Sequence, residues 1–445
     1  MPFIKSSDFG PDFIWGVSSS APQTEGHAEY DGKGASIWDT FAGIKGNIID
    51  QHTPAKASLF IEHFRRDIQL LAHLGIKNFR FSISWPRIFP DGKGNPNAKG
   101  ILFYQELVNQ LLENGITPWV TLYHWDLPQA LEDEGGWKNR ATYQHFCNYV
   151  AFCVNMLGDR VKNWMILNEP MVFAGAGYFL GIHAPGRRGL STFLPAMHHI
   201  ALAQSEGARA ARAEDHTANI GTTHSYTYFR AKNSQSKHMD AAQRADLFIN
   251  KLYPNLITGM GYPIDQLPFL RGVEKHIHQR DEINLSFPFD FWGIQVYTRH
   301  LVRHNFWIPY LKASLLDPRK RGKVTATGWE VYPDCMTKAI DSMNSIPGAP
   351  PLYITENGMA LHDHPSNGKV CDNERIQYLK DHLFKLMIAK KRGANVKGYF
   401  VWSATDNFEW AHGYHPRFGL IYIDFLSGER ILKDSAHWFS DFIRT

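Results

Sequence analysis

Two glutamate residues follow short segments that are dominated by apolar and β-branched side chains. Residues 351–355 (PLYIT) lead into Glu356, and residues 161–167 (VKNWMIL) lead into Asn168 and Glu169. Segments of this kind predict buried strands, so each glutamate is expected where a strand ends. One carboxylate in such a place is usually a solvated loop residue. The repetition of the pattern favours a shared site instead.

Two carboxylates that converge on one cavity are the minimum set for hydrolysing a glycosidic bond. One donates a proton, and the other is a nucleophile at a separation of about 5 Å or a base at about 6.5–9.5 Å; the sequence leaves both outcomes open. The apolar residues before Glu169 and a nearby negative charge would raise its pKa, as a proton donor requires. Arg80 and Tyr297 could donate hydrogen bonds to Glu356 and favour its ionised form.

The elements that must position these residues follow from the other apolar segments. Eight predicted strands lie at 13–20, 78–85, 118–125, 161–169, 219–225, 289–297, 351–358 and 396–403. Helical periodicity occurs between them, at 64–74, 102–112, 143–157, 197–213 and 375–389. This α/β alternation predicts a (β/α)8 TIM barrel with long βα loops over its C-terminal face. The segment after the first strand is not the glycine-rich turn that an open, doubly wound sheet would need.

Polar residues cluster at these predicted strand ends, where such barrels carry their chemistry. Taken singly, Arg80 could be a structural ion-pair partner, His124 a core histidine, and Trp402 and Trp410 core aromatics. Their shared position favours a site. The residues at or near strand ends are Arg80, His124, Asn168, Glu169, Tyr297, Glu356 and Trp402.

No linker or shift in composition divides the chain, so we expect residues 1–445 to form one catalytic domain. Segments 226–288 and 298–350 are expected to carry extra helices and loops over the barrel mouth. The 47 basic and 43 acidic residues are too balanced to indicate nucleic-acid binding. The 13 Trp, 18 Tyr and 29 Phe could form a large core or platforms for sugar rings.

The sequence also bears on cofactors and on the compartment. The four cysteines form no CxxC motif and no metal-like cluster, which favours buried free thiols in a reducing compartment. We see no signal-peptide core and no apolar run of the ~18 residues that a membrane helix needs. We therefore expect a cytoplasmic protein with no membrane partner, no metal and no cofactor; its oligomeric state is left open.

Longer motifs are similar to those of glycoside hydrolase family 1, the β-glucosidase family, and most of all its bacterial-type members. The resemblance extends from Phe13 to about Phe425. Its motifs are FIWGV (13–17), RFSISWPR (80–87), LYHWDLP (122–128), NEP (168–170), ITENG (354–358), DNFEW (406–410) and RFGL (417–420).

The resemblance implies a retaining, double-displacement hydrolysis of terminal β-D-glucosyl residues, with β-galactosidase or β-fucosidase activity on the side. The substrates would be small β-glucosides or short β-linked oligosaccharides. Glu169 would be the acid/base and Glu356 the nucleophile, oriented by Arg80, Tyr297 and Asn357. The substrate-binding residues would be Gln23, His124, Trp125, Asn168, Gln295, Tyr297, Trp329, Trp402, Glu409, Trp410 and Phe418.

Some positions depart from the family pattern. Gln295 stands where Asn is usual, and its extra methylene could shift a hydrogen bond near the sugar. Pro22 and Thr24, residues 59–61 and His224-Ser225 also differ from the usual residues. None of these changes removes a catalytic group, so they bear on the finer substrate preference.

Each alternative function would need a particular set of residues. A Schiff-base aldolase needs a lysine at a strand end, and none of the eight ends has one. His124, Glu169 and Glu356 could imitate the metal site of an isomerase. A sugar-binding barrel without catalysis would normally lack one glutamate. Within the family, Glu409 would repel the phosphate of a 6-phospho sugar, and Glu169 stands where plant thioglucosidases have Gln.

Overall fold

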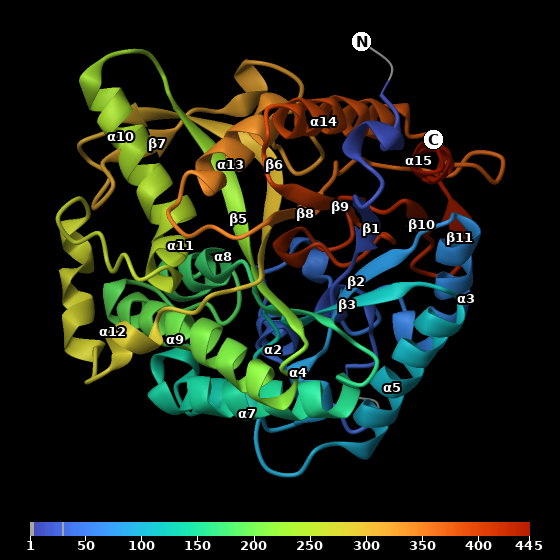
Figure 1. Ribbon diagram of the computed structural model, residues 1–445, viewed down its shortest axis with the longest axis horizontal. Helices are drawn as coiled ribbons and strands as arrows, with labels where there is room; N and C mark the ends of the chain where they lie inside the picture. Colours follow the sequence, from blue (N-terminus) through green and yellow to red (C-terminus); the bar gives the residue numbers. More distant parts are fainter. Residues whose placement is uncertain (1–3, 29–30) are drawn as a thin grey trace.

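The computed structural model describes residues 4–28 and 31–445. Residues 1–3 and 29–30, which belong to the domain predicted over 1–445, lie outside the described part. Eight parallel strands close into a barrel in the order β5-β4-β3-β2-β1-β9-β8-β6, and β6 pairs back with β5 (Figure 1). The barrel strands are β1 (Ile14–Ser18), β2 (Asn78–Ser82), β3 (Thr117–Tyr123), β4 (Asn163–Asn168), β5 (Asn219–Ala231), β6 (Phe291–His304), β8 (Leu352–Asn357) and β9 (Val396–Trp402). Each of the eight predicted strands is present, and the TIM-barrel prediction is confirmed.

Helices surround the barrel, and each of the five predicted helical segments corresponds to an observed one; four lie within it, and 64–74 extends one residue beyond its end. These five are α3 (Phe60–His73), α5 (Ala98–Glu113), α7 (Arg140–Leu157), α9 (Leu190–Glu214) and α14 (Asn373–Lys391). Three glycines that follow these helices, Gly75, Gly115 and Gly393, have φ values of 76°, 68° and 94°. These angles favour glycine, which explains why helices α3, α5 and α14 stop there and turn towards the next strand.

Shorter helices connect the main elements, and the chain ends in a helix beside its start. They are α1 (Ala21–Thr24), α2 (Ile37–Gly43), α4 (Trp85–Ile88), α6 (Gln129–Asp133), α8 (Pro170–Ala174), α10 (Ser236–Asp246), α11 (Leu252–Ile257), α12 (Asp281–Asn284), α13 (Asp334–Asn344) and α15 (Asp434–Ile443). The backbone N–H of Ser6 donates to the hydroxyl of Thr445 at 3.2 Å, so the two ends of the chain meet.

The barrel interior is filled by large side chains from several strands. Trp119, Met165, Phe291 and Phe400 form one buried cluster. Gly16 makes room for it: a Cβ at this position would lie 2.5 Å from the ring of Phe400. The strands are therefore held by a packed core.

The segments after β5 and β6 differ from the expectation of helices and loops. Both strands continue beyond the barrel as a paired ribbon, with Tyr228 opposite Arg299 and Ala231 opposite Val302. The short strand β7 (Ala313–Leu315) adds to β6, and α10 packs its alanines against Val302. Helices do follow, but residues 226–231 and 298–304 are strand because they bury a second apolar face against α10. A separate hairpin pairs β10 (Ile421–Ile423) with β11 (Arg430–Leu432).

The four cysteines are free, as predicted, but they are not all buried. Cys153 and Cys335 are buried, Cys147 is half-buried and Cys371 is exposed. Among the helices in residues 4–28 and 31–445, none is long and apolar enough to span a membrane.

Candidate active site

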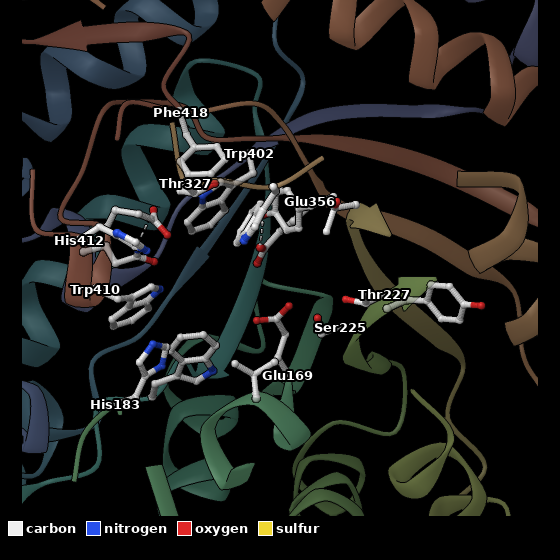
Figure 2. A pocket seen from close by; sticks show the side chains of 18 of the residues that line it. Glu169, His183, Ser225, Thr227, Thr327, Glu356, Trp402, Trp410, His412 and Phe418 are labelled. Atoms are coloured by element: carbon white, nitrogen blue, oxygen red, sulfur yellow. Dashed lines mark hydrogen bonds between the residues drawn. The ribbon is translucent and has the colours of Figure 1, made fainter. Parts of the chain in front are cut away.

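A cavity of about 290 Å³ opens at the carboxyl ends of the barrel strands (Figure 2). Glu169 follows the last residue of β4, and Glu356 is the penultimate residue of β8. Both line the cavity, and their carboxyl groups point towards one another. The central prediction, that two glutamates from different strands share one cleft, is confirmed. The lining residues are Gln23, His124, Trp125, Glu169, Val172, His183, Ser225, Tyr226, Thr227, Tyr297, Thr298, His300, Thr327, Trp329, Glu356, Trp402, Glu409, Trp410, His412 and Phe418.

Glu356 is held by donors from two other strands. The guanidinium of Arg80, on β2, donates from Nη1 to Oε1 of Glu356 at 2.5 Å. The hydroxyl of Tyr297, on β6, donates to Oε2 at 2.7 Å, and Nε2 of Gln295 lies 3.5 Å from Oε1. A charged donor and a phenol on opposite oxygens fix the orientation of the carboxylate.

Glu169 has the opposite surroundings. Burial raises the pKa of Glu169 well above its usual range, and the negative charge of Glu356 raises it further. A hydrogen bond from Ser225 and the more distant charge of Arg80 act against this shift without cancelling it. Glu169 therefore keeps its proton near neutral pH and can donate it.

Asn168 lies behind the cavity lining and hydrogen-bonds to four neighbouring side chains. Its side-chain oxygen accepts hydrogen bonds from Nη2 of Arg80, from Thr223 at 2.9 Å and from Gln295 at 2.9 Å. Its Nδ2 lies 3.1 Å from Nε2 of His124 and donates to it. This leaves Nδ1 of His124 to carry a hydrogen, and that buried atom has no partner among the described residues. His124 can therefore offer a donor to a ligand in the cavity.

A second polar group lies at the other end of the cavity, after β1 and β9. Gln23 donates from Nε2 to the backbone oxygen of Phe408 at 2.9 Å and to Oδ1 of Asn407 at 3.0 Å. The same nitrogen lies 3.4 Å from Oε2 of Glu409. Burial, together with the charge of Glu356, raises the pKa of Glu409 to about 8. Glu409 is therefore largely protonated at neutral pH and can both donate and accept hydrogen bonds.

Aromatic rings form two walls of the cavity. On one side, Trp125 stacks on Trp410 with ring centres 4.5 Å apart. On the other, Trp329 lies 5.1 Å from Tyr297 and 6.1 Å from Phe418. Flat apolar faces of this kind suit the C–H faces of sugar rings.

Most of the predicted site residues either line the cavity or lie directly behind the residues that line it. Those that line the cavity are Gln23, His124, Trp125, Glu169, Tyr297, Trp329, Glu356, Trp402, Glu409, Trp410 and Phe418. Arg80, Asn168 and Gln295 are fully buried behind this lining and contact it through hydrogen bonds. A contact of Asn168 and Gln295 with substrate stays a prediction; in the structure their amides hydrogen-bond to His124 and Glu356 of the lining.

Asn357, predicted to orient Glu356, points elsewhere. Its Nδ2 donates to the backbone oxygen of Val296 and to Tyr378 at 3.1 Å, and its Oδ1 accepts from Tyr399 at 2.7 Å. Among the described residues, no hydrogen bond joins its side chain to Glu356. Side chains alternate along a strand, so neighbours on β8 face opposite ways. Asn357 secures β8 to β6 and β9 instead.

Several lining residues were not predicted from the sequence: Val172, His183, Ser225, Tyr226, Thr227, Thr298, His300, Thr327 and His412. Most of them come from the extensions of β5 and β6 and from loops after β4 and β9. Ser225 to Thr227 lie at or just beyond the end of the strand predicted over 219–225, and this position was the signal that could have placed them in the cavity. The structure also bears on the alternative of a metal site in the cavity. Among the described residues, His124, Glu169 and Glu356 do not bring three ligand atoms within 4.8 Å of one another.

Comparison with known proteins agrees with this geometry. The family model described as glycosyl hydrolase family 1 matches residues 5–445. Beta-glucosidase A of Acetivibrio thermocellus is 39% identical over 442 residues, covering 98% of each chain. Beta-glucosidase A of Thermotoga maritima is 39% identical over 438 residues, again with 98% of each chain covered. A solved family 1 β-glucosidase from Thermotoga maritima superimposes with a TM-score of 0.93 at 38% identity, covering 98% of this chain and 97% of the other.

Proposed function

The chain belongs to glycosyl hydrolase family 1 and is a β-glucosidase of that retaining family, and we propose that Glu169 and Glu356 carry its double displacement. The observation that supports this assignment most directly is the contrast between two carboxyl groups in one cavity. Glu356 accepts hydrogen bonds from a guanidinium and a phenol, whereas Glu169 is buried with a raised pKa.

In the first step, an ionised oxygen of Glu356 attacks the anomeric carbon of the glucosyl unit. The bond to the leaving oxygen breaks as Glu169 transfers its proton to that oxygen, and a glycosyl–enzyme ester forms. Burial of Glu169 matters here because it keeps the proton available at neutral pH.

In the second step, Glu169 has lost its proton and acts as a base towards water. The resulting hydroxide equivalent attacks the anomeric carbon, Glu356 leaves as a carboxylate, and Glu169 regains its proton. Two inversions give net retention of the β configuration. Arg80 and Tyr297 orient Glu356 for its attack in the first step and stabilise the carboxylate that departs in the second.

For the sugar in the first subsite, we assign the hydroxyl contacts to Gln23, His124 and Glu409. All three line the cavity, and the buried Nδ1 of His124 has no partner among the described residues. Trp402 and Trp410 would pack against the ring. A homologous β-glucosidase has been solved in complex with deoxynojirimycin, a sugar-like ligand. We propose that the natural ligands are small β-glucosides or short β-linked oligosaccharides, with galactosides and fucosides as secondary substrates.

Further features of this proposal concern the chain as a whole. We propose one domain over residues 1–445 and action in the cytoplasm, which the free cysteines support. The two carboxyl groups account for the chemistry without a metal. Activity on nitrophenyl β-glucoside should therefore persist after dialysis against EDTA, and abolition of turnover by the chelator would favour a metal-dependent mechanism.

The decisive experiment follows the configuration of the first product by NMR. β-Glucose should appear before mutarotation produces the α anomer; initial release of α-glucose would contradict a double displacement. A 2-deoxy-2-fluoro glucoside with a good leaving group should trap the ester, and peptide mass analysis should locate the label on Glu356. A panel of nitrophenyl β-glycosides and cellobiose would then rank the sugars.

A further inference from the structure

A cluster of possible metal ligands lies outside the cavity. Asp50, His52 and His415 each offer one ligand atom, and these atoms all lie within 4.8 Å of one another. Nε2 of His415 is 2.8 Å from Oδ2 of Asp50, and the two imidazole rings have centres 5.2 Å apart. His52 is half-buried, and the other two residues are exposed. Two segments far apart in sequence thus bring three possible metal ligands together.

The second histidine is what distinguishes this cluster from an ordinary surface ion pair. In the structure, Nδ1 of His52 accepts the backbone N–H of Tyr414 at 3.2 Å, which orients the ring. When Nε2 binds an ion, Nδ1 carries the hydrogen of the imidazole and gives up this contact. The ring also packs on Gly413, where a Cβ would lie 2.4 Å from Nδ1. The orientation of His52 is therefore set by the backbone that also carries His415.

The donor set selects among cations. Two imidazoles and one carboxylate suit zinc and neighbouring transition metals, whereas magnesium and calcium prefer oxygen ligands alone. Three protein ligands leave a fourth tetrahedral position for water. The existing hydrogen bond between His415 and Asp50 holds two of the ligands close together before any ion arrives.

We propose that Asp50, His52 and His415 form a binding site for a borderline divalent cation such as Zn²⁺, separate from the catalytic carboxyl groups. The ion would tie the turn η2 (Ile49–Gln51) to the segment that follows η8 (Trp410–His412). That segment is coupled to the cavity, because the backbone N–H of Glu409 donates to the oxygen of Gly413 at 2.7 Å. Binding at the rim would therefore stabilise the loop that carries Glu409.

Calorimetric titration of the intact, EDTA-treated protein with ZnCl₂ tests the site without using activity, so its outcome is independent of the proposed function. We expect one Zn²⁺ per chain and no comparable binding of MgCl₂. His415→Gln retains a side chain that can donate to Asp50 but removes an imidazole, and it should weaken Zn²⁺ binding about tenfold or more. His437→Gln removes an exposed histidine of α15 as the matched control and should bind like the wild type.

Thermal melting provides a second readout. Zn²⁺ should raise the melting temperature of the wild type and of His437→Gln but not that of His415→Gln or Asp50→Asn. Melting of each variant without metal checks that it is folded. Equal Zn²⁺ affinity in the wild type and His415→Gln, or no stoichiometric binding by the wild type, would overturn the proposal.

Discussion

The ends of β4 and β8 carry the same residue type at the same height of the barrel, yet they create two different acids. At the end of β8, Glu356 receives hydrogen bonds from Arg80 and Tyr297. At the end of β4, Glu169 has burial and a like charge as its main influences. The comparison shows that two glutamates at strand ends can take different chemical roles. In the mechanism that we propose, Arg80 on β2 and Tyr297 on β6 make Glu356 the nucleophile, whereas Glu169, which lacks these partners, is the acid.

The sharpest way to break the comparison is to remove the carboxylate at β8. Glu356→Ala should lower kcat for nitrophenyl β-glucoside by roughly 10⁴-fold or more, because no other group forms the ester. Steady-state kinetics measure the loss, and an unchanged melting profile shows that the fold persists. Retention of more than a few per cent of wild-type kcat would remove Glu356 from the role of nucleophile.

Removing the carboxyl at β4 should give a selective defect. In Glu169→Ala, turnover of glucosides with alkyl leaving groups should fall by roughly 10²–10⁴-fold, since these leave only when protonated. Glucosides with dinitrophenyl leaving groups need no proton, and formation of their ester should be nearly unaffected. Pre-steady-state bursts on both substrate classes provide the measurement. An equal loss for both classes would mean that Glu169 is not the acid.

This contrast also shows how far sequence reasoning extends. Periodicity located the strands that bear Glu169 and Glu356, because barrel strands and helices differ in the spacing of apolar residues. The polar ends of β2 and β6 correctly indicated Arg80 and Tyr297. The family resemblance supplied Gln23, Trp125, Trp329, Glu409 and Phe418, for which spacing alone gave no signal.

The direction of side chains at strand ends could not be read from the sequence. Asn357 follows Glu356 but hydrogen-bonds to Val296, Tyr378 and Tyr399, because successive side chains of a strand face opposite ways and the register depends on the neighbouring strands. The pairing of β8 with both of its neighbours, β6 and β9, shifts register near Glu356. No sequence pattern predicts these shifts. The ribbon of β5 and β6, which contributes Tyr226 and His300, is stabilised by tertiary packing on α10 and therefore escaped a local analysis.

A finer change weakens the partners of Glu356 and keeps the carboxylate. Tyr297→Phe removes the 2.7 Å hydrogen bond to Oε2. A hydrogen bond to a charged group contributes about 1.5–3 kcal/mol, which corresponds to a loss of about 10–150-fold in kcat/KM. Because Glu356 takes part in both steps, as the attacking group and then as the leaving group, kcat should fall more than KM changes. A pure KM effect would indicate that Tyr297 contacts substrate and does not act through Glu356.

The pH profile tests the environment of Glu169. The Ser225 hydroxyl hydrogen-bonds this carboxyl and lowers its pKa, against the upward effect of burial. In Ser225→Ala the pKa of Glu169 should therefore rise, and the alkaline limb of kcat/KM should move to higher pH. Thr227→Val, which also alters a hydroxyl residue of the cavity, should leave the limb in place. Movement to lower pH in Ser225→Ala would contradict the assignment.

The smallest expected effect concerns Gln295, where the family usually has Asn. Its Nε2 is 2.9 Å from Asn168 and 3.5 Å from Glu356, so its bond to the nucleophile is at the limit of hydrogen-bond length. Asn168 keeps Arg80 and Thr223 as donors when this amide is shortened. Gln295→Asn should therefore change kcat/KM by only about threefold, close to the weakest net hydrogen bonds of about 0.5 kcal/mol. Nitrophenyl glucoside, galactoside and fucoside measure the profile; a tenfold or larger loss would place Gln295 beside Tyr297 among the groups that hold the nucleophile.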